Sequence, residues 1–207
     1  MRRPEFIARQ AGCPSGVLGH FLARVMALET ARDNERAVEL LAPRPADHVL
    51  EIGFGHGRTI GRMAGLVRDG AIAGVEVSER MLGMAARFNR RLIEQGRLEL
   101  KLAHRTAAIP YGAGRFDRVL SVHTLYFWPE PGNTFREVRR VTKRGGRLVI
   151  GFRRGEDDSI VRDFPASVYR FYKCDAVERL LEEAGFREIR LATLGGDARG
   201  MVFAIAE

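Results

Sequence analysis

Cysteine is scarce in this chain, which contains only Cys13 and Cys174. Two cysteines cannot supply a zinc cluster or a disulfide framework, so we expect a reducing compartment and no metal site. No stretch approaches the run of about 18 uncharged apolar residues that crosses a membrane. The opening MRRPEFIARQAGCP lacks the apolar segment of a signal peptide. We therefore expect a cytoplasmic protein.

Lysine is also scarce, because Lys101, Lys143 and Lys173 are the only three and every other basic residue is arginine. Lys+Arg number 34 and Asp+Glu 26, which gives a net charge of +8. Such an excess can indicate a polyanionic partner. The basic residues are scattered, however, apart from a modest cluster between positions 136 and 154. We therefore expect no nucleic-acid partner. A nucleic-acid partner remains the alternative interpretation of the charge.

The composition favours one folded domain with a substantial core. The chain has 207 residues, of which 45% are hydrophobic and 29% are charged, and both fractions are ordinary for a globular protein. No linker or internal repeat divides the sequence. We predict a single domain over residues 1–207, with a helical cap at 1–46 and an α/β core at 47–207.

Short β-branched runs alternate with segments of helical period from about Val49 onward. The expected strands are 48–52, 71–77, 98–103, 118–122, 147–152, 188–194 and 201–207. The expected helices are 58–69, one that Ser78 caps, 133–142, and 175–184. The helix after Ser78 carries an apolar stripe, expected chiefly in the core, of Met81, Leu82, Ala85, Phe88 and Leu92. This order predicts an α/β fold with a Rossmann-like seven-stranded sheet, mostly parallel, with an antiparallel C-terminal strand and helices on both faces.

The residues before the first strand have helical spacing. An apolar stripe at i, i+4, i+8 positions favours a helix between residues 17 and 26, and Asp33 is a candidate cap for a second helix that runs to Ala42. We expect these helices to cover the domain, and a membrane- or lipid-docking helix is the alternative.

The segment VLEIGFGHGRT joins the first strand to a helix through glycines 53, 55 and 57. Glycines allow the backbone to approach a ligand closely, and the helix start offers free N–H groups. Dinucleotide-binding loops follow G-x-G-x-x-G, but Arg58 occupies the place of their third glycine. The pattern is instead E-x-G-x-G-x-G, which argues against a pyrophosphate ligand.

Two carboxylates accompany this loop. Glu51 lies inside the first strand, where it would repel a pyrophosphate and attract a cationic group. Glu76 ends the second strand, where a carboxylate suits acceptance from a ribose diol. One acid for a cation and one for a ribose, with no phosphate site between them, fits S-adenosylmethionine.

These residues resemble motif I and the following acidic position of the class I S-adenosylmethionine-dependent methyltransferases. The similarity runs from about Val38 to the final strand. It includes the Phe116-Asp117 pair and the Arg140-x-x-x-x-Gly-Gly lead-in to the fifth strand. Within that family the sequence looks closest to the ubiquinone/menaquinone C-methyltransferase type, without a substrate signature. The resemblance implies an enzyme whose cofactor is S-adenosylmethionine.

The resemblance also implies cofactor contacts at matching positions. Glu51 would hold the methionine amino group and Glu76 the ribose hydroxyls. The remaining implied contacts are Gly53, Phe54, Gly55, Gly57, Val77, Met81 and Ser121. Arg105 stands where the family often has an aspartate for adenine, and a guanidinium cannot accept a hydrogen bond. The backbone of Arg105, Thr106 and Ala107, or stacking by the guanidinium, would then serve adenine.

Candidates for acceptor chemistry follow the fourth strand. His123 is the best general base by residue type, and Tyr126 is a second catalytic candidate. Tyr126, Phe127 and Trp128 would form an aromatic wall or part of the core. The segment lacks the Asn/Asp-Pro-Pro-Tyr/Phe sequence of enzymes that methylate exocyclic amines, and no Pro-Cys dipeptide of cytosine-C5 methylation is present.

We therefore expect methyl transfer to a small-molecule or lipid-like acceptor. An RNA or protein methyltransferase is an alternative, with the arginines between positions 136 and 154 as its contact. A non-catalytic module that binds S-adenosylmethionine or a nucleotide is another, and Arg58 argues against its dinucleotide form.

Overall fold

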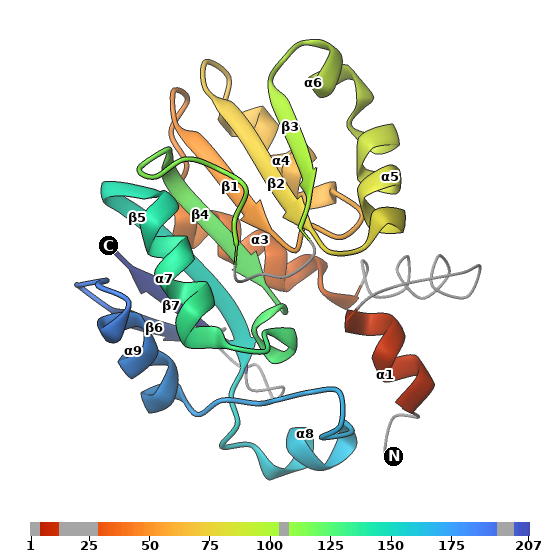
Figure 1. Cartoon of the computed structure of the whole chain (residues 1–207), viewed down its shortest axis with the longest axis vertical. Coiled ribbons are helices and arrows are strands. Elements are labelled where there is room, and N and C mark those ends of the chain that lie inside the picture. Colours follow the sequence, from red (N-terminus) through yellow and green to blue (C-terminus); the bar gives the residue numbers. More distant parts are fainter. Residues whose placement is uncertain (1–4, 13–28, 104–107, 194–200) are drawn as a thin grey trace.

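The computed structural model describes residues 5–12, 29–103, 108–193 and 201–207, and a seven-stranded sheet runs through its middle (Figure 1). The strand order is β3-β2-β1-β4-β5-β7-β6. The strands are β1 (His48–Ile52), β2 (Ala71–Glu76), β3 (Leu98–Leu102), β4 (Phe116–Val122), β5 (Thr142–Arg153), β6 (Arg190–Thr193) and β7 (Met201–Ala206). The predicted fold class is confirmed.

Strand direction follows from the connections. The pairings among β1 to β5 are all parallel, since helical segments return the chain to the same end of the sheet between most of these strands. The strand β7 is antiparallel to both β5 and β6. The carboxyl ends of β1, β2 and β4 consequently meet at one edge of the sheet, where the glycine loop, Glu76 and His123 all lie.

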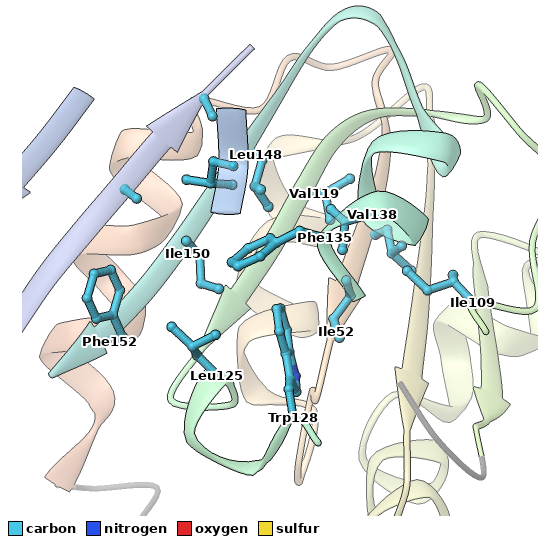
Figure 2. Close-up of a cluster of buried hydrophobic side chains, with 14 of the residues drawn as sticks. Ile52, Ile109, Val119, Leu125, Trp128, Phe135, Val138, Leu148, Ile150 and Phe152 are labelled. Carbon is cyan, nitrogen blue, oxygen red and sulfur yellow. The ribbon is translucent and has the colours of Figure 1, made fainter. Parts of the chain in front are cut away.

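Helices cover both faces because each buried strand places successive residues on opposite sides. Val49, Leu120 and Val149 pack with α3, α4 and α5, whereas Leu50 and Val119 pack with α7 and α9. Figure 2 shows the second layer, in which Phe135 and Val138 of α7 lie over Leu148 and Ile150. The helices are α1 (Glu5–Gly12), α3 (Ala31–Leu41), α4 (Arg58–Leu66), α5 (Glu79–Phe88), α6 (Arg90–Glu94), α7 (Pro131–Val141), α8 (Asp158–Asp163) and α9 (Cys174–Glu183), with the 3₁₀ turn η1 (Leu125–Phe127).

Two local predictions were wrong. The helix after Ser78 does not run unbroken to Leu92, because it breaks at Asn89, whose side-chain amide donates to the carbonyls of Gly57 and Ala85. Ser78 does cap α5, accepting from the Met81 N–H. Asp33 caps nothing, since Thr30 precedes α3 as its N-cap residue. The stripe at 17–26 lies outside the described residues.

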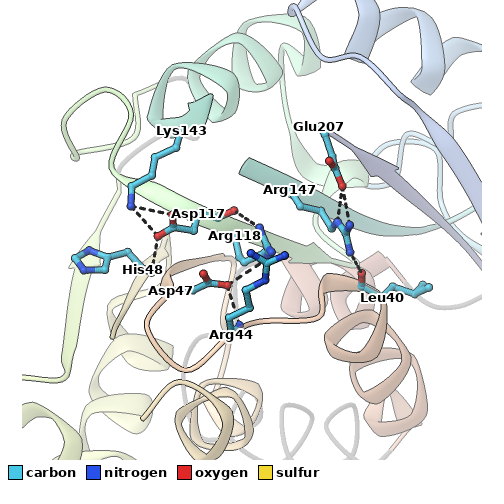
Figure 3. A network of polar contacts seen from close by, with 9 residues as sticks. All are labelled: Leu40, Arg44, Asp47, His48, Asp117, Arg118, Lys143, Arg147 and Glu207. Atoms are coloured by element: carbon cyan, nitrogen blue, oxygen red, sulfur yellow. Dashed lines mark hydrogen bonds and ion pairs between the residues drawn. The ribbon is translucent and has the colours of Figure 1, made fainter. Parts of the chain in front are cut away.

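The amino-terminal edge of the sheet carries a network of paired charges (Figure 3). The Lys143 ammonium lies 2.8 Å from the Asp117 carboxylate, and the Arg147 guanidinium lies 2.7 Å from that of Glu207. Arg118 pairs with Asp47 at 3.4 Å. Among the described helices, none is long and apolar enough to cross a membrane.

Candidate functional site

The glycine loop follows β1 and takes left-handed backbone angles, with φ of 71° at Gly53, 54° at Gly55 and 80° at Gly57. L-residues rarely adopt such angles. The three glycines also differ in how much room a Cβ would have. A Cβ on Gly53 would lie 2.3 Å from Thr124 Cγ2, and one on Gly57 would lie 2.7 Å from Ala85 Cβ. Gly55 has no heavy atom within 4 Å of that point, so it borders open space that a ligand can fill.

Glu51 is a buried carboxyl with little compensation. Its side chain lies in β1, the residue is 5% exposed, and its Oε2 has no hydrogen-bond partner among the described residues. Burial, together with the nearby charge of Glu76, raises the pKa of Glu51 to about 8, against a smaller opposing hydrogen bond with the Thr59 side chain. An unpartnered buried oxygen is costly, so Glu51 is poised for a cationic or donating ligand.

Glu76 is buried as well but is held by three backbone N–H groups. Its Oε2 accepts from Gly55 at 2.9 Å, and its Oε1 accepts from Val77 at 2.8 Å and Ser78 at 3.0 Å. Burial raises the pKa of Glu76, and these three bonds act in the opposite direction. A carboxylate has about four acceptor positions, so one remains on Oε2 for a ligand hydroxyl. Glu76 thus holds the glycine loop and keeps one acceptor position that a ligand can use.

The histidine in the loop does not bring a positive charge to these carboxylates. Burial lowers the pKa of His56, and the neighbouring charge of Arg58 lowers it further. Its Nδ1 accepts from the Arg58 N–H at 3.2 Å. The neutral ring therefore offers neither carboxyl group an ion pair.

The other predicted cofactor contacts differ in what they expose. The Phe54 ring packs into the core against Gly74, which leaves the backbone of Phe54 for a ligand. Met81 is buried in α5, whereas Val77 is 37% exposed. The Ser121 hydroxyl is buried and donates to the Ile52 carbonyl at 3.1 Å. Arg105, Thr106 and Ala107 lie outside the described residues.

His123 follows β4 at the same edge of the sheet. Its φ is 58°, and its N–H donates to the Gly151 carbonyl at 2.9 Å. The next residue, Thr124, is the one that closes against Gly53. His123 Nδ1 lies 3.3 Å from the Tyr126 hydroxyl, and its Nε2 lies 2.8 Å from Asp33 Oδ2. His123 therefore directly precedes the residue that contacts the glycine loop, and each nitrogen of its ring has a partner.

The aromatic residues after β4 pack into two different parts of the core. Trp128 is 3% exposed and packs against Phe135, with ring centroids 5.1 Å apart, so it belongs to the core (Figure 2). Tyr126 is also buried, and its ring contacts a group of aromatic side chains, namely Phe127, Tyr169 and Phe171. Burial raises the pKa of Tyr126, so its hydroxyl keeps its proton at neutral pH.

Three side chains at this site have no direct signal in the linear sequence. Asp33 reaches His123 from a helix 90 residues earlier. Thr59 lowers the pKa of Glu51 through a side-chain hydrogen bond, and the Thr124 side chain lies against Gly53. Small hydroxyl residues beside a glycine loop could have been flagged, but the Asp33 contact depends on how α3 packs against the sheet. In the described residues, no three His, Cys, Asp or Glu side chains gather as metal ligands.

Residues 50–150 match a family model described as a methyltransferase domain. The uncharacterized methyltransferase YdaC of Bacillus subtilis is 31% identical over 139 residues, which cover 65% of this chain and 72% of that protein. An O-methyltransferase of Pyrenophora dematioidea is 26% identical over 77% of this chain, which spans only 61% of the fungal protein. A solved S-adenosylmethionine-dependent methyltransferase from Aquifex aeolicus shares the fold, with a TM-score of 0.69 at 22% identity over 84% of this chain and 88% of that one.

Proposed function

This chain belongs to the class I S-adenosylmethionine-dependent methyltransferases, and we propose that it methylates a hydroxyl group on a small apolar or planar molecule. The observation that carries the proposal is His123 at the carboxyl end of β4, where the next residue, Thr124, contacts Gly53 of the glycine loop and the imidazole is hydrogen-bonded to Asp33. A base at that place suits an acceptor that must lose a proton.

The residues of the loop fit the cofactor. The unpartnered, buried Oε2 of Glu51 would accept from its cationic amino group, and the free acceptor position of Glu76 would take a ribose hydroxyl. Gly55 provides room for the close approach of backbone and ligand. The half-exposed Val77 would complete the binding surface, with the buried Met81 and Ser121 supporting it from below. When bound, the cofactor supplies an electrophilic methyl group on a positively charged sulfur.

The acceptor side is proposed from its neighbours. Tyr126, next to His123, packs in the core with Tyr169, and the half-buried Phe127 and Phe171 are the members of this aromatic group that could face an apolar or planar molecule. In this arrangement His123 receives the acceptor's proton while Tyr126, buried and protonated, supports the ring. The O-methyltransferase name of the fungal relative supports an oxygen acceptor.

Labelled methyl transfer tests this proposal. The protein is incubated with cell extract and S-adenosylmethionine that carries a labelled methyl group, and the extract is then separated into small molecules, RNA and protein. We expect the label in the small-molecule fraction, as methyl ethers rather than as N-methylated amines. Label that disappears on ribonuclease or protease treatment would support the RNA or protein alternative instead.

Cofactor binding is measured separately by calorimetry with S-adenosylmethionine, S-adenosylhomocysteine and NAD. Binding of the first two without NAD supports the roles given to Glu51 and Glu76. Binding without any methyl transfer would support the non-catalytic alternative.

A further inference from the structure

Asp33 forms a contact that none of the roles above explains. It lies in the first turn of α3, yet it does not cap that helix, whose N-cap residue is Thr30. Its Oδ2 lies 2.8 Å from His123 Nε2, and both side chains are largely buried, at 15% and 18% exposed. A close, shielded pair of this kind is a strong constraint on the orientation of the ring.

The helix that carries Asp33 is anchored on the sheet. The α3 residues Ala37, Val38 and Leu41 are buried in the core. The Arg147 guanidinium also donates to the Leu40 carbonyl at 3.3 Å (Figure 3). The carboxylate therefore meets His123 from a fixed position rather than from a loose segment.

The pairing determines which ring nitrogen is basic. An ionised carboxylate only accepts hydrogen bonds, so Nε2 of His123 must carry the hydrogen, and the lone pair of the neutral ring lies on Nδ1. Tyr126 approaches Nδ1 at 3.3 Å while its hydroxyl oxygen accepts from the Arg153 N–H. The contact to Nδ1 is longer than an ordinary hydrogen bond of this kind, so a substrate hydroxyl can compete for that lone pair.

The backbone of His123 is unusual in the same place. A non-glycine residue with a φ of 58° is uncommon and tends to persist where the surroundings fix it. Here the N–H is held by the Gly151 carbonyl of the neighbouring strand and the ring by Asp33. Two independent contacts, one to the backbone and one to the side chain, set the orientation of a single imidazole.

We propose that Asp33 is a positioning residue for methyl transfer, holding His123 in the tautomer whose base is Nδ1. This inference rests on the proposed function. With cofactor and acceptor bound, Nδ1 of His123 would take the proton of the acceptor hydroxyl, whose oxygen would bond the methyl carbon with its electron pair as the carbon–sulfur bond breaks and leaves its pair on sulfur. The Asp33 carboxylate then stabilises the imidazolium that has formed.

Other ionisable groups around the ring do not replace Asp33. Tyr126 of η1 meets Nδ1 and stays protonated, since burial raises its pKa. Arg153, at the end of β5, acts on Tyr126, and its charge cannot stabilise an imidazolium. Among the described side chains facing His123, Asp33 is the acidic one at hydrogen-bond distance.

The first test reads the tautomer directly and needs no acceptor. A long-range ¹⁵N–¹H spectrum of the histidine rings is recorded, with His123 assigned by the signal that disappears in His123→Asn. We expect hydrogen on Nε2 in the wild-type protein and a mixture of tautomers in Asp33→Asn. Hydrogen on Nδ1 in the wild type, or an unchanged spectrum in the variant, would overturn the proposal.

The second test measures turnover with catechol as the probe acceptor. We expect kcat to fall about 10- to 100-fold in Asp33→Asn with little change in KM, the acidic limb of the pH profile to move, and Asp33→Glu to restore part of the rate. Glu35→Gln is the matched control, since Glu35 lies on the same helix in an exposed pair with Arg62.

The two tests separate this inference from the function on which it rests. If the wild-type protein methylates no hydroxyl acceptor but shows the Asp33-dependent tautomer, the oxygen acceptor is wrong and the positioning of His123 is supported. If Asp33→Asn also loses affinity for S-adenosylhomocysteine, Asp33 is structural and the proposal is overturned.

Discussion

The two edges of the sheet use acidic residues in opposite ways. At the amino-terminal edge, the Asp117 and Glu207 carboxylates each have a cation within 3 Å (Figure 3). At the carboxyl edge, Glu51 and Glu76 are more deeply buried and act on each other, and Glu51 has an oxygen without a partner. One edge is compensated within the chain, whereas the other is left for a ligand to compensate.

The backbone does not divide the edges in the same way. Left-handed angles occur at Gly53, Gly55, Gly57 and His123 on the carboxyl edge, and also at Gly114 and Gly145 on the amino edge. Carboxyl groups whose pKa values are shifted by burial concentrate at sites that bind or react. The edges therefore differ in their carboxyl groups: those at the amino edge are paired within the chain, whereas Glu51 at the carboxyl edge has an oxygen without a partner among the described residues.

Substitution of Glu76 should give the largest effect, because this residue holds the glycine loop and is also proposed to bind the ribose. In Glu76→Gln the amide nitrogen cannot accept, so one of the Gly55, Val77 and Ser78 N–H groups faces a donor or loses its partner. We expect the free energy of unfolding to fall by about 1–3 kcal/mol and the affinity for S-adenosylmethionine to fall about 10- to 100-fold. Urea unfolding and calorimetry measure the two quantities.

The control for this variant is Glu79→Gln, an exposed position at the start of α5. It should leave cofactor affinity unchanged. A Glu76→Gln protein with normal affinity would refute the ribose contact, and one with normal stability would refute the role of Glu76 in holding the loop.

Substitution of Glu51 should change stability and cofactor affinity in opposite directions as the pH rises. Because its pKa is raised to about 8 in the folded protein, the folded state binds a proton that the unfolded state has lost between about pH 4.5 and 8. The stability of the wild-type protein therefore falls as pH rises through this window, by at most about 1.4 kcal/mol per unit from this group. Glu51→Gln, which mimics the protonated acid, should match the wild type near pH 4 and become relatively more stable toward pH 8.

Cofactor affinity should respond in the opposite sense. Glu51 must lose its proton to hold an ammonium group, so the advantage of the wild type over Glu51→Gln should grow up to about pH 8 and reach about 10- to 100-fold. Calorimetry across this range measures it. Parallel affinity curves for the two proteins would remove Glu51 from the cation contact.

Most of the fold could be predicted because it depends on local pattern. The β-branched run at 48–52 and the glycine that follows it define β1 and its turn, and the helices α4, α7 and α9 have clear apolar stripes. The break at Asn89 could not be predicted, since it depends on the Asn89 amide reaching Gly57 across the fold. Phe88 was expected in the core, but it is 62% exposed beside that break.

The site could be predicted only in part for the same reason. The spacing of Glu51, the three glycines and Glu76 is written in the sequence. The N–H bonds that hold Glu76 and the missing partner of Glu51 are properties of packing. The contact between Asp33 and His123 joins residues 90 positions apart, so the sequence allowed a helix cap where the structure has a partner for the imidazole.

Substitution of Asp117 should give the smallest effect. It tests whether a change at the amino edge of the sheet alters cofactor affinity at the carboxyl edge. Burial raises the pKa of Asp117, but the Lys143 ammonium and the His48 N–H more than offset this, so the pKa is lowered overall. Its contribution to stability is thus present above about pH 4 and is lost as the pH falls below that value. Asp117→Asn should cost about 1 kcal/mol at neutral pH and less in acid, as urea unfolding would measure. Affinity for S-adenosylmethionine should not change, since Asp117 lies at the opposite end of β4 from the glycine loop; a fall in affinity would mean that charge pairing at one edge sets the geometry of the other.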